Sequence, residues 1–157
     1  MTGIPDGASL AAARERLAGR VHVTPVFRCR TLDARSGATL HLKAESMQRA
    51  GAFKIRGATS AVRALSDEEA ARGVATHSSG NHAAALALAA RERGIAAWIV
   101  MPRDAPAVKR AAVEGYGGRI ETCAPTLAAR EEGLERVVAR TGARVVHPFD
   151  DPLVVAG

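Results

Sequence analysis

Lysine is scarce in this sequence: Lys43, Lys54 and Lys109 are the only lysines among 22 basic residues. A lysine amine can lose its proton and form a Schiff base with a carbonyl group, which a guanidinium cannot do. Lys54 follows a glycine-containing loop and an aromatic residue, and it falls at the start of a predicted helix. The positive end of the helix dipole disfavours a protonated amine there, so Lys54 is a candidate nucleophile. The alternative is an exposed lysine on a helix, with Gly51 serving the turn.

A second candidate site is the polar segment from Thr76 to His82, which reads Thr-His-Ser-Ser-Gly-Asn-His. It lies where a predicted strand ends and a predicted helix begins, and ligands of open α/β sheets bind beyond the carboxyl ends of the strands. Free N–H groups at a helix start attract anions. Two hydroxyls, a glycine and an asparagine therefore predict a cradle for a carboxylate or a phosphate, whereas the alternative is an ordinary Ser/Asn helix cap.

Alternating strand and helix patterns position these residues. Short β-rich runs at 73–76, 95–100, 119–122 and 144–146 are separated by stretches of helical length at 81–93, 106–115 and 126–140. This alternation predicts an α/β fold, an open parallel sheet of βα units in a three-layer α/β/α arrangement. Upstream we expect a helix at 9–19, a strand at 39–43, a helix at 53–65 and a short helix that opens with a capping box at Ser66.

Composition and missing motifs exclude several classes of protein. Hydrophobic residues make up 47% of the 157 residues and charged residues 24%, which is typical of a globular chain and excludes disorder. The net charge of +6 accompanies dispersed arginines and only 3% aromatic residues, so nucleic acid is not expected as a partner. Without an apolar run of membrane length or a signal sequence, we expect a cytoplasmic protein with no membrane partner. Cys29 and Cys123 have no metal-ligand spacing and no dinucleotide, P-loop, zinc-protease or hydrolase motif occurs, so no metal site is expected.

Two longer motifs, in this order, resemble a known enzyme family. Glu-x-x-Gln-x-x-Gly-Ala-Phe-Lys-x-Arg-Gly-Ala spans residues 45–58, and Ser-Ser-Gly-Asn-His spans residues 78–82. Together they resemble the fold-type II pyridoxal-phosphate enzymes, and within these the group of threonine dehydratases, serine dehydratases and serine racemases. The resemblance covers residues 23–157, with further matches at Thr24-Pro25, Met101-Pro102, Pro106 and Lys109.

The resemblance implies a role for each matching residue. Lys54 corresponds to the lysine that holds pyridoxal 5'-phosphate as a Schiff base and then transfers protons. Phe53 and Asn81 correspond to the residues that contact the cofactor ring and its 3′-oxygen. The loop that binds the substrate carboxylate is matched by Ser78, Ser79, Gly80, Asn81 and His82. Ser79 also matches the serine that moves a proton on the opposite face in racemases, so Lys54 and Ser79 are the candidate catalytic residues.

The resemblance also implies a domain organisation that continues beyond this sequence. Residues 1–72 would belong to a large cofactor domain, residues 73–148 would form a small βα domain, and residues 149–157 would begin the return to the large domain. The phosphate loop and the partner of the pyridine nitrogen are expected in a missing C-terminal half. Ala52 stands where many relatives have serine, and Ala83-Ala84 replaces a pair that usually ends in glutamine. These departures weaken any assignment of the substrate.

The resulting interpretation is a pyridoxal-phosphate-dependent dehydratase, an ammonia-lyase that converts L-threonine or L-serine to a 2-oxo acid and ammonia. We expect a homo-oligomer when the protein is complete. A serine racemase of the same family is the alternative. From a different class, the chain would be a truncated, non-catalytic remnant that binds a small anion or an interaction partner.

Overall fold

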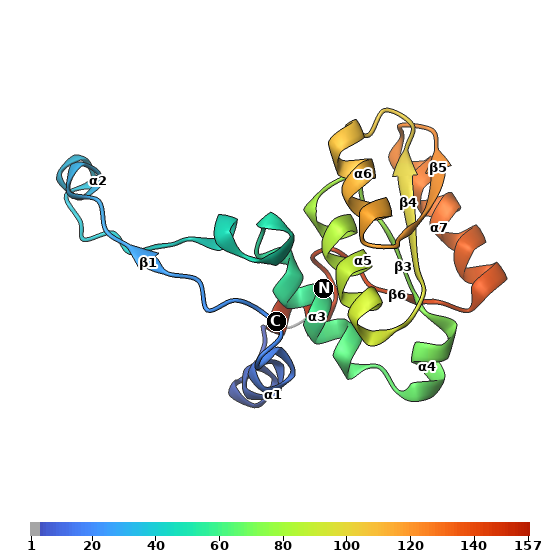
Figure 1. The fold of residues 1–157 in the computed structure, drawn as a ribbon, viewed down its shortest axis with the longest axis horizontal. Coiled ribbons are helices and arrows are strands. Elements are labelled where there is room, and N and C mark those ends of the chain that lie inside the picture. The colour runs from blue at the N-terminus through green and yellow to red at the C-terminus, as the bar shows by residue number, and fades with distance from the viewer. Residues whose placement is uncertain (1–3) are drawn as a thin grey trace.

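The computed structural model describes residues 4–157, and its centre is a sheet of four parallel strands (Figure 1). The strands β3 (Val74–His77), β4 (Ala97–Pro102), β5 (Arg119–Cys123) and β6 (Arg144–Val145) lie in the order β5-β4-β3-β6. β3 pairs with β4 from Val74↔Ala97 to His77↔Val100. The predicted parallel sheet is therefore confirmed.

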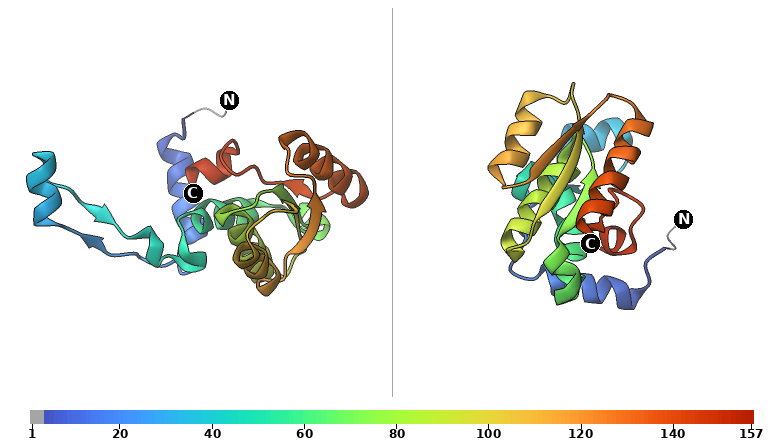
Figure 2. Two further views of the ribbon diagram at one scale, coloured as in Figure 1. Left: turned by 90° about the horizontal axis from the view of Figure 1, so that it is seen from above. Right: turned by 90° about the vertical axis from the view of Figure 1, so that its right-hand side faces the viewer.

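Helices cover both faces of this sheet and give three layers (Figure 2). α5 (Asn81–Arg93) and α6 (Ala107–Gly115) lie on one face, and α7 (Leu127–Thr141) lies on the other. Successive side chains of a strand point to opposite faces. Ile99 and Met101 accordingly pack in the cluster that contains α5, whereas Val100 between them packs with Val137 of α7. The predicted three-layer α/β/α arrangement is confirmed by this packing.

The helix that carries the candidate lysine, α3 (Lys54–Ala64), packs against α5. Residues 83–90 of α5 are all buried, and six of these eight residues are alanine. Small side chains let two helices approach closely, and Ile55, Ala58 and Val62 of α3 are buried at this contact. Because α5 also covers the sheet, this packing fixes Lys54 relative to the strand ends.

The last helix, α8 (Pro152–Ala156), packs on α3 at Gly57. A Cβ atom at Gly57 would lie 2.6 Å from the backbone oxygen of Val154, so a larger residue would push the helices apart. α1 (Gly7–Leu17) contacts both of these helices. α4 (Asp67–Arg72) follows α3 and begins with the predicted capping box of Ser66.

Residues 26–43 form an arm that projects from this body (Figures 1 and 2). β1 (Val26–Phe27) and β2 (Leu42–Lys43) pair in antiparallel fashion, and α2 (Arg30–Ser36) lies between them in the chain. The arm exposes the apolar side chains of Val26, Phe27, Leu32 and Leu42. After the arm, two short 3-10 turns, Glu45–Met47 and Arg49–Gly51, lead to α3.

Several predicted boundaries are wrong by a few residues. α1 begins at Gly7 rather than Ser9 because the carboxylate of Asp6 caps it, accepting the Ser9 N–H at 2.8 Å. β4 begins later than predicted because the Ile95 N–H still closes the end of α5, where Gly94 is left-handed. The strand predicted at 39–43 is reduced to Leu42–Lys43, and the sequence analysis did not predict β1, α2 or α8.

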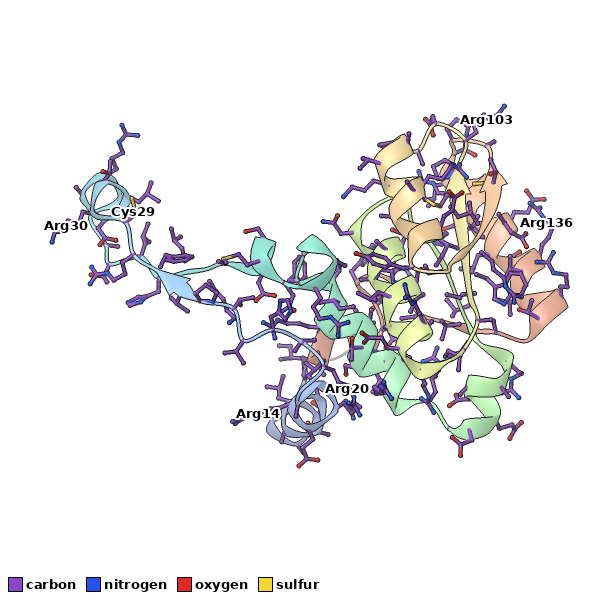
Figure 3. All side chains as sticks on the ribbon, in the orientation of Figure 1. Arg14, Arg20, Cys29, Arg30, Arg103 and Arg136 are labelled. Atoms are coloured by element: carbon purple, nitrogen blue, oxygen red, sulfur yellow. The ribbon has the colours of Figure 1, made fainter. Side chains whose placement is uncertain are left out.

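The arginines are dispersed over the structure. Figure 3 shows Arg14 beside α1, Arg30 on the arm, and Arg103 and Arg136 on the far side of the body. Cys29 also lies on the arm, whereas Cys123 ends β5, and both cysteines are free. Within residues 4–157, no helix combines the length and the apolar character that a membrane crossing requires.

Candidate active site

The candidate site lies at the carboxyl edge of the sheet. β3 and β6 are parallel neighbours, so the loops that follow them leave the sheet at the same edge. The loop after β3 is Ser78–Gly80, and the segment after β6 includes residues 147–150. α3 brings Lys54 to the second of these segments.

Lys54 is the first residue of α3, and its Nζ donates a hydrogen bond to the backbone oxygen of Pro148 at 2.6 Å. The centre of the Phe53 ring lies 5.1 Å from this nitrogen, and 57% of Phe53 is exposed. Both residues line a cavity of about 240 Å³ together with Pro148 and Phe149. An amine beside an exposed aromatic ring in such a cavity can react with a small planar molecule that carries a carbonyl group.

A second cavity, of about 370 Å³, is lined by the Ser78–Gly80 loop. Pro148 and Phe149 line both cavities, so this segment lies between the loop and Lys54. α5 begins directly after Gly80 without a side-chain cap, which leaves its first N–H groups available to an anion. The loop is therefore suited to bind a carboxylate.

His82 contributes to this region in a different way from the neighbouring serines. Its imidazole is only 3% exposed, and Nε2 lies 3.1 Å from the backbone oxygen of Val146. Because a carbonyl oxygen only accepts, Nε2 carries the proton, and Nδ1 is buried without a partner in residues 4–157. Burial lowers the pKa of His82 to about 4, against the opposing effect of the Val146 hydrogen bond. The neutral ring thus ties α5 to the end of β6, and only its backbone N–H remains for a substrate.

Asn81 is exposed at the first position of α5, and its side chain turns towards α6. Its Oδ1 accepts a hydrogen bond from Lys109 Nζ at 2.5 Å. Asn81 lines neither of the two cavities just described. The structure therefore brings Lys54 together with Phe53, and the serines together in their loop, while Asn81 lies beside them against the next βα unit.

An ion pair fixes the segment that precedes the candidate lysine. Arg56 donates to both carboxylate oxygens of Glu45, at 2.8 and 2.7 Å, and Thr24 Oγ1 donates to Glu45 Oε1 at 2.6 Å. The hydrogen bonds from Arg56 hold the pKa of Glu45 at about 2. Gln48 adds two bonds to the backbone of His22. These polar residues of the 45–58 motif therefore hold the loop in place and face away from any reaction.

Three parts of this region were not found from the sequence: Arg130, His147 and the Pro148-Phe149 segment. His147 Nδ1 accepts the Asp150 N–H at 2.9 Å, and its ring lies 6.2 Å from that of His77. Burial lowers the pKa of His77, and the charges of His147 and Arg130 act in the same direction. The position of His147 directly after a predicted strand was the available signal. Within residues 4–157, no group of three His, Cys, Asp or Glu side chains could hold a metal ion.

The chain is similar to several curated proteins. It is 49% identical over 154 residues to the β-hydroxyaspartate dehydratase of Paracoccus denitrificans, covering 98% of this chain and 49% of that protein. It is 50% identical over 149 residues to the serine racemase of Oryza sativa subsp. indica, covering 95% of this chain and 44% of that protein. The chain thus spans about half the length of the curated relatives it matches.

Solved structures and a family model agree with these similarities. Maize serine racemase superposes with a TM-score of 0.95 at 47% identity, covering 98% of this chain and 47% of that chain. A threonine deaminase from T.th. gives 0.88 at 42% identity, covering 98% and 48%. The family model described as "Pyridoxal-phosphate dependent enzyme" matches residues 17–157, which include every candidate residue discussed above. By this match, and with a lysine, an aromatic ring and an anion-binding loop at the expected places, the chain belongs to the family of pyridoxal-phosphate-dependent enzymes.

Proposed function

We propose that this chain provides the reactive lysine and the substrate loop of an ammonia-lyase, a dehydratase that converts L-threonine or L-serine to a 2-oxo acid and ammonia. The observation that carries the proposal is the position of Lys54, which lies at the first residue of α3 beside the exposed ring of Phe53. The similarity to a threonine deaminase supports the reaction class.

The described residues fit one side of pyridoxal 5'-phosphate. Lys54 offers an amine to its aldehyde, Phe53 offers a ring face, and Asn81 offers an amide to its 3′-oxygen. When bound, the cofactor supplies an electron sink for the negative charge that develops at the substrate Cα. Residues that would bind its phosphate are expected outside this sequence.

The chain's own groups divide the work at the substrate. Lys54 Nζ takes the α-proton once it has released the backbone oxygen of Pro148. The first N–H groups of α5 and the hydroxyls of Ser78 and Ser79 bind the carboxylate. On this proposal residues 1–72 serve the cofactor, residues 73–148 serve the substrate, and residues 149–157 return to α3 through α8. Assembly with a second copy and a cytoplasmic location stay predictions.

Racemisation is the second candidate, and Ser79 is the residue that favours it. Its loop lies across the Pro148-Phe149 segment from Lys54, as a proton donor for the opposite face of the substrate would. The similarity to serine racemases adds support. Ser79→Ala is then expected to reduce racemisation far more than dehydration, and equal losses would instead assign Ser79 to carboxylate binding.

Arg130 bears on the choice of substrate. It lines the cavity of the Ser78–Gly80 loop and a neighbouring cavity of about 210 Å³ that also includes Ser79. None of the ion pairs within residues 4–157 involves Arg130, so its guanidinium is available to a second carboxylate. We therefore add a β-hydroxy dicarboxylic amino acid to the proposed substrates, in line with the similarity to a β-hydroxyaspartate dehydratase. Arg130→Leu should raise KM for hydroxyaspartate while leaving KM for L-serine unchanged.

The decisive experiment replaces Lys54 in the protein expressed from its full reading frame. Lys54→Ala should abolish both the visible absorption of the bound cofactor and the formation of 2-oxo acid, because no other lysine of the described chain lines the cavity. Lys43→Ala is the matched control, since Lys43 bonds to Thr24 O and lies beside Glu45. A Lys54→Ala protein that kept the absorption and the activity would remove the central claim, and absence of cofactor binding in the unsubstituted protein would favour a non-catalytic remnant.

A further inference from the structure

The hydrogen bond between Lys109 and Asn81 joins two separate βα units. Lys109 lies in the first turn of α6 and Asn81 is the first residue of α5, and the two helices pack on the same face of the sheet. Lys109 Nζ lies 2.5 Å from Asn81 Oδ1, and none of the ion pairs within residues 4–157 involves Lys109. The ammonium charge is therefore directed at the amide.

The polarity of this contact decides which way the amide points. An ammonium group has three donors and no acceptor, so it can bond only to the amide oxygen. With Oδ1 fixed on Lys109, the Nδ2 hydrogens of Asn81 must face away from α6. The amide can then donate to an acceptor, and the cation polarises it so that this donation is strongest to an anionic oxygen.

Without Lys109, nothing in the described chain would choose this orientation. Asn81 is exposed, and within residues 4–157 its side chain forms a hydrogen bond only with Lys109. An exposed amide rotates freely and presents its oxygen as readily as its nitrogen. An oxygen turned towards an anionic acceptor would repel it, so the orientation matters for binding.

We propose that Lys109 is a positioning residue that holds Asn81 with its Nδ2 group presented to the 3′-oxygen of pyridoxal 5'-phosphate. This inference rests on the proposed function, because the contact of Asn81 with the cofactor is itself proposed. Lys109 acts only through the amide and has no contact of its own with cofactor or substrate.

The experiment is a double-mutant cycle on the full reading frame, with the affinity for pyridoxal 5'-phosphate as the measured quantity. The variants are Lys109→Met, Asn81→Ala and the pair together, with Lys43→Met as a matched lysine control. The cofactor is titrated into the apoprotein, and its dissociation constant and absorption maximum are recorded. A thermal melt of each apoprotein verifies folding.

One lost hydrogen bond changes an equilibrium constant by about tenfold, so we expect Lys109→Met to weaken cofactor binding about fivefold to tenfold. Lys109→Arg, which keeps a charged donor, should restore most of the affinity. The double variant should bind no more weakly than Asn81→Ala alone, because Lys109 acts through Asn81. Lys43→Met should bind like the unsubstituted protein.

Each contrary result has a separate meaning. If Asn81→Ala weakens binding but Lys109→Met does not, or if the two effects add, the positioning role is overturned while the proposed function stands. If Asn81→Ala leaves the affinity and the absorption maximum unchanged, the amide does not contact the cofactor and the positioning role falls with it. Loss of cofactor binding in Lys54→Ala alone still supports the proposed function in that case.

Discussion

Replacing His82 by glutamine should remove much of the pH dependence of folding between about pH 7.5 and about pH 5. Glutamine keeps an N–H donor for Val146 O but does not titrate in this range. The substitution therefore removes the buried ionisable group while it preserves the link between α5 and the end of β6.

The magnitude follows from the pKa of His82, which burial lowers from 6.5 to about 4. Below pH 6.5 the unfolded chain binds a proton at this residue that the folded chain does not bind. Stability is therefore fully present above pH 6.5 and is lost as the pH falls from 6.5 towards 4. Linkage gives a loss of about 2 kcal/mol at pH 5 and about 3 kcal/mol for the complete shift.

Urea unfolding at the two pH values measures this loss in the unsubstituted protein and in His82→Gln. The lowered pKa of His77 acts in the same direction, but it is present in both proteins and cancels in the comparison. His41→Gln, at an exposed histidine, is the control and should behave like the unsubstituted protein. If the free energy of unfolding falls equally between the two pH values in all three proteins, the argument from burial is refuted.

Three further predictions concern stability and cofactor retention. Glu45→Gln should lower the free energy of unfolding by about 2 kcal/mol at neutral pH, because it weakens the pair with Arg56. Since the pKa of Glu45 lies at about 2, this stabilisation is present above pH 4.5 and is lost as the pH falls from 4.5 to about 2, which denaturation across that range would detect. Gly57→Ala would put a Cβ atom 2.6 Å from Val154 O, so we expect a loss of about 1–3 kcal/mol in thermal unfolding, whereas an unchanged melting temperature would contradict the close packing of α3 and α8. Residues 1–157 expressed alone should lose pyridoxal 5'-phosphate on dialysis and form no 2-oxo acid, and stoichiometric retention with turnover would contradict the need for phosphate-binding groups outside this sequence.

Local patterns were sufficient to predict the sheet and its covering helices. Each of the four parallel strands is a short β-rich run, and the intervening helices are long enough to show their own composition. The arm gave no such signal, because its strands have two residues each and depend on each other for their assignment. α8 is short and is held by its contact with Gly57, which is distant in the sequence.

The candidate site could be predicted where residue type alone carries the chemistry. Lys54 stands out as one of three lysines, and the Ser78–Gly80 loop lies at a predicted strand end. The bond between Lys54 and Pro148 joins residues 94 positions apart, and no local pattern predicts it. The burial of the His82 ring likewise depends on where Val146 lies in the folded chain.

The arm leaves the body and returns to it at nearly the same point. Pro25 O accepts the Ala44 N–H at 3.0 Å, and Val26 pairs with Lys43 directly beyond that bond. Residues 27–42 could therefore be excised and Val26 joined to Lys43 through a two-residue Asn-Gly turn without moving either end. Genetically the arm is a cassette: it can be shortened, exchanged between homologues or tagged while the sheet and the lysine helix keep their places.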